Sequence, residues 1–327
     1  MAALPMMPTP HYAAKNRATT GGCPYRTMRY IDLYNSGELL DRVRLGYARL
    51  KSCDLCPHEC GVNRLAGATG VCRAGARPRI ASANIHRGEE PPISGTRGSG
   101  TIFLTGCSLH CRFCQNFPIS QLGNGNDLST VELAGRFVRL QALGAHNINF
   151  VTPTHFLPQI LAALYLAAPQ GFRLPIVWNS SGYERVDALR LLDGIVDIYL
   201  PDMKYAADEQ AVRLSAAPGY REINRAAVKE MLRQVGHLEL DEVGVAVRGM
   251  IIRHLVLPCG SAGSGETLAW TGANLGSETH VSLMKQYFPA HEAASVSGID
   301  RKLTDEEYEE AVAALEEVGL QNGWVQE

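Results

Sequence analysis

Apolar segments of strand length alternate with amphipathic segments of helix length over most of this chain. The pattern predicts strands at residues 101–105, 147–152, 174–179, 195–200, 250–257 and 281–287. It predicts helices at residues 129–143, 156–168, 184–192, 221–235 and 304–318. Ser129 and Thr304 are each followed three residues later by a glutamate, as in a capping box. Strands that alternate with helices indicate βα units around a parallel sheet, and the pattern alone leaves an eight-stranded barrel, a partial barrel and an open doubly wound sheet as alternatives.

The length and charge of the chain limit its class. Its 327 residues are enough for one large α/β domain with a smaller appendage. The formal net charge of −2 gives no basic excess for nucleic acid or an anionic membrane, and no apolar run is long enough to span a bilayer. We therefore expect neither nucleic-acid nor membrane partners. The nine cysteines occur mostly at metal-type spacings, which indicates a reducing, cytoplasmic location.

The chain divides into three predicted regions. Residues 1–28 are expected to form a flexible N-terminal tail, because they begin with a mixture of Pro, Ala and small polar residues and lack the continuous apolar segment of a secretory signal. Residues 29–94 are expected to form a Cys-rich region with a metal knuckle. Residues 95–327 are expected to form the α/β core.

Three cysteines lie directly after the first predicted strand and Gly106. They are Cys107, Cys111 and Cys114. Three thiolates on a short loop can ligate three irons of a [4Fe–4S] cluster and leave the fourth iron open to a substrate or cofactor. The alternative is a zinc knuckle with His110 as the fourth ligand. The spacing favours the cluster.

Residues 106–116, GCSLHCRFCQN, resemble the signature of the radical S-adenosylmethionine (SAM) superfamily. This resemblance implies that the core is a partial (β/α)6 barrel of the TIM type. It also implies that SAM binds the open iron and that an electron from the cluster breaks its C–S bond to give a 5′-deoxyadenosyl radical. Phe113 stands where the family places an aromatic ring against the adenine.

The resemblance extends to the carboxyl ends of the other predicted strands, where barrel enzymes gather their sites. Asp202 and Lys204 resemble the Asp-x-Lys of glycyl-radical activating enzymes, which helps to hold SAM; the alternative is a structural ion pair at the barrel rim. The chain lacks the Gly-Gly-Glu segment that many family members carry after the second strand. Besides Phe113, the resemblance places at SAM the residues Thr152, Thr154, Asn179, Ser181, Asp202, Lys204, Arg253 and His291.

Three residues are candidates for acid–base or hydrogen-atom chemistry. His86 and Glu89 belong to residues 86–95, a segment that precedes the first predicted strand and can bring ionisable groups to the barrel mouth. The alternative for this segment is a solvated linker. Cys259 follows the fifth predicted strand, where a thiol can donate a hydrogen atom, although a lone cysteine is more often a small buried residue.

Four further cysteines precede the core. They are Cys53, Cys56, Cys60 and Cys72. Four thiolates at this spacing can bind one zinc ion or a second iron–sulfur cluster. The residues around them include too few apolar side chains to build a core, so a bound metal would replace that burial. The sequence leaves both alternatives open: a zinc staple, or an auxiliary cluster that passes electrons or holds substrate.

Residues 30–310 resemble the radical SAM proteins related to pyruvate formate-lyase activating enzyme. The resemblance implies an oxidoreductase that abstracts hydrogen from a protein or peptide, typically to generate a glycyl radical, with flavodoxin or ferredoxin as electron donor. A second interpretation keeps this chemistry and changes the target to a small molecule or peptide anchored by the upstream metal. A third is a non-enzyme, either an iron–sulfur electron-transfer protein or a zinc-binding protein. The sequence does not distinguish consumption of SAM from its recycling.

Overall fold

The computed structural model describes residues 28–326, with strands and helices in alternation. The predicted tail, residues 1–28, lies outside the described residues except for Met28, which is buried. The strands are β1 (Arg79–His86), β2 (Ser99–Leu104), β3 (Asn126–Asp127), β4 (Ile148–Val151), β5 (Ile176–Ser180), β6 (Ile198–Pro201), β7 (Glu239–Leu240), β8 (Ala246–Leu255), β9 (His280–Met284) and β10 (Gly323–Val325). The α-helices are α1 (Arg29–Ser36), α2 (Glu38–Arg49), α3 (Pro91–Ser94), α4 (Phe117–Ser120), α5 (Thr130–Ala142), α6 (Leu157–Ala167), α7 (Val186–Leu189), α8 (Asp208–Ser215), α9 (Tyr220–Val235), α10 (Ser264–Leu275) and α11 (Asp305–Glu317).

The strands form one sheet in the order β10-β9-β8-β6-β5-β4-β2-β1-β3, and the short β7 pairs with β8. Neighbours along this path from β2 to β10 are parallel, whereas β1 is antiparallel to both β2 and β3. The six predicted strands correspond to β2, β4, β5, β6, β8 and β9, and each is followed by a helical segment. The fold is therefore the expected α/β partial barrel of the (β/α)6 type. The Cys-rich region extends the sheet through β1.

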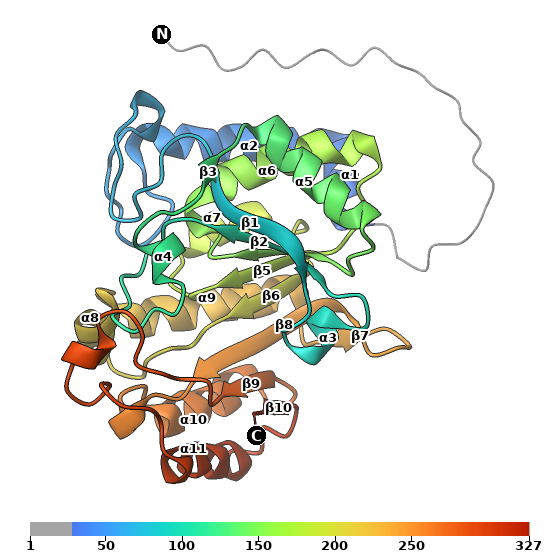
Figure 1. Ribbon diagram of the computed structural model, residues 1–327. Helices are drawn as coiled ribbons and strands as arrows, with labels where there is room; N and C mark the ends of the chain where they lie inside the picture. The colour runs from blue at the N-terminus through green and yellow to red at the C-terminus, as the bar shows by residue number, and fades with distance from the viewer. Residues whose placement is uncertain (1–27, 327) are drawn as a thin grey trace.

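Helices cover the outer face of this sheet (Figure 1). Helix α6 packs against both α2 and α5, which explains why it is apolar on nearly all sides and almost wholly buried. Phe150 of β4 points to this face and meets Phe137 of α5, with ring centroids 5.3 Å apart. Figure 1 shows α10 and α11 beside β9 and β10, at the opposite end of the molecule from α1 and α2.

Both predicted capping boxes are present. The side chains of Ser129 and Thr304 accept from the backbone N–H groups of Glu132 and Glu307 at the starts of α5 and α11. The sequence pattern did not predict α1, α2, α3, α4, α8 or α10, nor β1, β3, β7 and β10. Most of these elements are short, and α10 contains two glycines that lower its helix propensity.

The inner face of the sheet encloses the barrel lumen. Because side chains alternate across a strand, Val177 of β5 and Ile198 of β6 point inward. Ile93 of α3 is fully buried against them, and the Asn147 side-chain amide donates to its carbonyl at 2.8 Å. Residues 86–95 therefore do not form a solvated linker throughout: their second half enters the core.

Candidate active site

The three cysteines of the predicted cluster loop follow β2 at the carboxyl edge of the parallel strands. Gly106 bends the chain into this loop with a φ of +78°, and a Cβ at this position would clash with the carbonyl oxygen of Cys72. Only glycine fits there without strain. On its other side the loop is held by α8, because the backbone N–H of His110 donates to the Ser215 carbonyl at 2.9 Å.

Each of the three sulfur atoms has a hydrogen-bond partner. The partners are the Leu109 N–H for Cys107 (3.3 Å), the Ser215 hydroxyl for Cys111 (2.9 Å) and the Ser120 hydroxyl for Cys114 (3.1 Å). Hydrogen bonds to the sulfurs are one of the ways in which a protein sets the potential of an iron–sulfur cluster. The donor set of this loop therefore fits a cluster held by three thiolates.

As free thiols, the buried cysteines of this loop hold their protons at neutral pH. Burial raises the pKa of Cys111 to about 11, against the lowering effect of the Lys204 ammonium. Burial also raises the pKa of Cys107. Iron would have to displace these protons, as metals do at cysteine sites. Lys204 supplies a positive charge that offsets the negative charge of such thiolates.

Asp202 and Lys204 point to the same side of the strand end, as their spacing predicts. Lys204 Nζ lies 2.7 Å from Asp202 Oδ2. Burial opposes the charge on Lys204, but Asp202 and Cys111 together outweigh it, so the pKa of Lys204 lies above its ordinary value. The rim ion pair is thus present, and it adjoins the cluster loop. The SAM-binding role of the pair stays a prediction.

Arg253 of β8 belongs to the same layer of the lumen and forms a β-bridge with Asp202. Its Nη1 donates to Asn179 Oδ1 at 3.1 Å, and its Nε lies 2.8 Å from Glu90 Oε1 in an ion pair. Burial disfavours the guanidinium charge, but the Glu90 and Asp202 carboxylates keep the pKa of Arg253 above its ordinary value. The predicted residues Asn179, Asp202, Lys204 and Arg253 therefore form one connected charged layer.

Glu90, an ionisable group of the 86–95 segment that was not among the named candidates, also belongs to this layer. It is only 7% exposed, and its Oε2 atom has no hydrogen-bond partner among the described residues. Its neighbour Glu89 was predicted as a candidate. Burial raises the pKa of Glu89, whereas Arg253 lowers it. The segment before β2 thus does bring carboxyl groups to the barrel mouth.

Asn149 of β4 is a second residue that was not predicted. It is fully buried and pairs in register with Thr101 of β2, on the lumen side of the sheet. Neither its Oδ1 nor its Nδ2 has a hydrogen-bond partner within residues 28–326. Buried polar atoms are normally satisfied by protein, water or a ligand, so these atoms mark a place where one of the last two fits. An asparagine inside an otherwise apolar strand was the available signal.

Three further predicted residues surround the mouth of the lumen. Thr152, at the end of β4, has left-handed backbone with a φ of +57°. Ser181 is buried after β5, and its carbonyl accepts from the Tyr220 hydroxyl at 2.8 Å. The His291 ring stacks on Phe117 next to the cluster loop, with centroids 4.8 Å apart. No contact in the described chain tests their assignment to SAM, which stays a prediction.

Phe113 and Thr154, which were also predicted to bind SAM, pack against other side chains and not against the charged layer. Phe113 is buried, with its ring 5.9 Å from that of Tyr287. Thr154 is buried near Glu184, whose carboxyl accepts from the Trp178 indole at 3.1 Å. Trp178 belongs to the core on the helix-covered face of the sheet. Thr154 is thus buried beside this core, and its assignment to SAM, like that of Phe113, stays a prediction.

The two remaining catalytic candidates are exposed. His86 ends β1, and its ring lies 6.4 Å from that of Phe103. Cys259 has left-handed backbone (φ +55°), and its Sγ lies 3.4 Å from Arg301 Nη2 while its N–H donates to Glu307. Cys259 is therefore not a small buried residue, and its contacts do not join it to the charged layer.

The four upstream cysteines gather in one loop region. Cys53, Cys56 and Cys72 are buried and Cys60 is half-buried. The Gly61 N–H donates to the Cys53 carbonyl at 2.9 Å and the Val71 N–H donates to Cys60 Sγ at 3.5 Å, which ties the cysteine turns together. Burial raises the pKa of Cys56 to about 12, and the charges of the three other thiols add to this increase. Within residues 28–326 no three His, Cys, Asp or Glu side chains are arranged to hold a single metal ion. The choice between zinc and a second cluster stays a prediction.

The upstream cysteine region is docked onto the cluster loop. His58 Nε2 lies 2.7 Å from the Ser108 carbonyl oxygen, and His110 Nε2 lies 3.1 Å from the Val71 carbonyl oxygen. Together with the contact between Gly106 and the Cys72 carbonyl, these bonds make the two cysteine loops one packed unit.

No family model matches the chain. The uncharacterized protein MJ0674 of Methanocaldococcus jannaschii is 33% identical to it over 298 residues, which cover 88% of this chain and 81% of that protein. This chain belongs to the family of MJ0674.

Three solved structures resemble this chain in part. HydG, a maturase of the [FeFe]-hydrogenase, has a TM-score of 0.43 and 11% identity, covering 66% of this chain and 48%, about half, of HydG. TYW1 with a lysine–pyruvate adduct bound has a TM-score of 0.40 and 12% identity, covering 66% of this chain and 73% of TYW1. A radical SAM methyltransferase from Sphaerobacter thermophilus has a TM-score of 0.43 and 18% identity, covering 69% and 65% of the two chains.

In this member of the MJ0674 family, two kinds of functional group lie at the same edge of the sheet. One is a loop of three hydrogen-bonded thiols, and the other is a layer that carries both ammonium or guanidinium groups and carboxylates. Such a layer can bind a ligand that has a positive and a negative group close together. None of the described helices is both long and apolar enough to cross a membrane.

Proposed function

We propose that this protein is a radical SAM enzyme in which Cys107, Cys111 and Cys114 hold a [4Fe–4S] cluster. When bound, such a cluster supplies the electron for reductive cleavage of SAM, with 5′-deoxyadenosine as the product after hydrogen abstraction. The observation that carries the proposal is the position of the three partnered thiols beside the charged layer of the lumen. A zinc knuckle would not require that layer.

The residues of the layer have roles that follow from their charge. Lys204 and Arg253 are cations that suit the carboxylate of SAM, and Asp202 and Glu90 are carboxylates that suit its ammonium group. The burial of Glu90 and the partial burial of Asp202, Lys204 and Arg253 reduce screening by water, which strengthens both attractions.

We further propose that the hydrogen donor is a protein or peptide, as for glycyl-radical activating enzymes, and that a flavodoxin or ferredoxin supplies the electron. The support is the Asp-x-Lys pair, Asp202 and Lys204. A small-molecule substrate is the second candidate. It is favoured by the fully buried, unpartnered amide of Asn149, whose polar atoms a small polar ligand could satisfy.

The test is anaerobic reconstitution with iron and sulfide, followed by reduction with dithionite in the presence of SAM. The parent chain should hold a cluster and release 5′-deoxyadenosine, measured by chromatography. Cys111→Ala should lose both, whereas Cys259→Ala, which removes an exposed cysteine outside the loop, should keep the parent's iron content. Release of 5′-deoxyadenosine by Cys111→Ala at the parent's rate would refute the assignment.

A further inference from the structure

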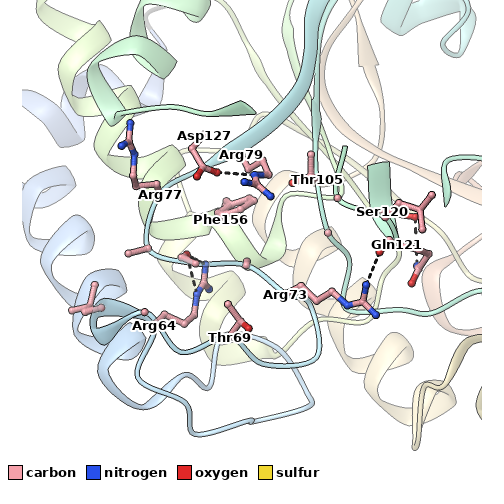
Figure 2. A pocket seen from close by; sticks show the side chains of 18 residues that line it. Arg64, Thr69, Arg73, Arg77, Arg79, Thr105, Ser120, Gln121, Asp127 and Phe156 are labelled. Atoms are coloured by element: carbon pink, nitrogen blue, oxygen red, sulfur yellow. Dashed lines mark hydrogen bonds and ion pairs between the residues drawn. The ribbon is translucent and has the colours of Figure 1, made fainter. Parts of the chain in front are cut away.

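A cleft of about 480 Å³ lies between the Cys-rich region and the outer side of the cluster loop. One wall comes from residues 64–79 of the Cys-rich region, and another comes from residues 120–123, which follow the cluster loop. Figure 2 shows Arg73 beside Gln121 on one side of this cleft, with Arg79 and Arg77 on another. The cleft is separate from the charged layer of the lumen.

The lining of this cleft is strongly cationic. Its charged residues are Arg64, Arg73, Arg77, Arg79 and Asp127. Four guanidinium groups against one carboxylate leave a charge of +3. Asp127 lies 2.7 Å from the Nε of Arg79, so this one acid is already neutralised. Residues 61–80 contain these four arginines and no Asp or Glu, in a chain whose net charge is −2.

Two of these arginines have donors to spare. Arg73 donates through Nη1 to the Gln121 carbonyl at 2.7 Å, and Arg77 donates through Nε to the Leu128 carbonyl at 3.4 Å. Their remaining N–H groups donate to no acceptor among the described residues. Arg77 does lie near one carboxylate outside the cleft, that of Glu132, whose pKa is lowered mainly by its hydrogen bonds to Ser129 and also by the Arg77 charge. Both side chains are exposed, and the backbone carbonyls hold them in place at the cleft.

Arg64 also places a positive charge beside the cleft, but its N–H groups are already used by other acceptors. It is 1% exposed and donates only to the backbone carbonyls of Gly75 and His155 and, at 3.9 Å, to Cys53 Sγ. No carboxylate of the described chain pairs with it. Its potential counter-charges are the Cys53 and Cys72 thiols, which would be negative as metal-bound thiolates, so an anion in the cleft would be bound by Arg73 and Arg77.

We propose that this cleft binds a small molecule that carries a phosphate or carboxylate group. The planar guanidinium forks of Arg73 and Arg77 match the oxygens of either group, and the cleft volume falls in the range of small-molecule sites. The ligand would lie behind the cluster loop, because Gly106 and Ser120 line the cleft and the Ser120 hydroxyl lies 3.1 Å from Cys114 Sγ. This proposal does not depend on the proposed function.

The test is calorimetric titration of the full chain with inorganic phosphate and, separately, with succinate, at constant ionic strength. We expect saturable binding of at least one anion, and the preferred one identifies the group. Arg73→Gln and Arg77→Gln should each weaken that binding about tenfold, because each removes a charge-assisted hydrogen bond. The control Arg139→Gln removes an exposed arginine of α5, outside the cleft, and should bind as the parent does.

Two results would overturn the proposal: no saturable binding of either anion by the parent, or unchanged affinity in the Arg73→Gln, Arg77→Gln double variant. Thermal unfolding of each variant, monitored by circular dichroism, checks that the fold is intact. Binding is measured without reconstitution, so its outcome is independent of whether the protein cleaves SAM.

Discussion

The ion pair between Glu90 and Arg253 allows a quantitative prediction. The two side chains are 5% and 19% exposed, so water screens their 2.8 Å contact only weakly. Removing one partner of a buried pair leaves the other charge uncompensated, which costs about 3–5 kcal/mol. Arg253 keeps its hydrogen bond to Asn179 and the nearby charge of Asp202. We therefore expect Glu90→Gln to lower the free energy of unfolding by the smaller amount of about 2–3 kcal/mol.

Urea unfolding of the metal-free chain, followed by circular dichroism, measures this loss as a shift of the midpoint at constant m-value. The matched control is Glu292→Gln. Glu292 pairs with Arg112 at 3.1 Å, but these side chains are 53% and 43% exposed, so its loss should stay below about 1 kcal/mol. The reasoning fails if the two variants lose the same stability. A double-mutant cycle gives a second test. If Arg253→Gln lowers the free energy of unfolding by the same amount in the Glu90→Gln variant as in the parent, the two side chains are not coupled and the reasoning fails.

Three further predictions concern the cluster loop and the core. Gly106→Ala should cost at least about 1 kcal/mol in urea unfolding and reduce iron incorporation, because its Cβ meets the Cys72 carbonyl at a positive φ; parent-like values would contradict this. Burial raises the pKa of Asp197 to about 7 in the folded chain, against about 4 in the unfolded chain. Asp197 therefore loses its proton at lower pH in the unfolded chain, so the free energy of unfolding should fall as the pH rises from about 4 to about 7. Asp197→Asn should flatten this fall in the thermal midpoint. Ser215→Ala removes the hydroxyl donor to Cys111 Sγ and should make the reduction potential of the reconstituted cluster more negative in an EPR-monitored titration.

The strands that carry the site were predictable because buried parallel strands form continuous apolar runs. The two-residue spacing of Asp202 and Lys204 was enough to predict that they point the same way. Glu90 and Asn149 were not predicted as lumen residues. For Glu90 the reason is a non-local contact: its segment has the prolines and charges of a linker, and only the burial of Ile93 against β5 and β6 brings it into the barrel.

The Cys-rich region was hardest to predict because packing against the core, and not a core of its own, determines its position. Apart from a small cluster around Leu50 and Leu55, its buried apolar side chains, such as Leu39 and Val43, belong to the main core, because α2 packs on α6 and β1 pairs with β2. Its contacts with the cluster loop come from single atoms, such as the His58 ring nitrogen and the Cys72 carbonyl oxygen, which no periodicity encodes. The same region supplies the arginines of the outer cleft. The Cys-rich region therefore does two things for the core of six βα units: it supports the cysteine loop from outside, and it supplies a second charged surface next to that loop.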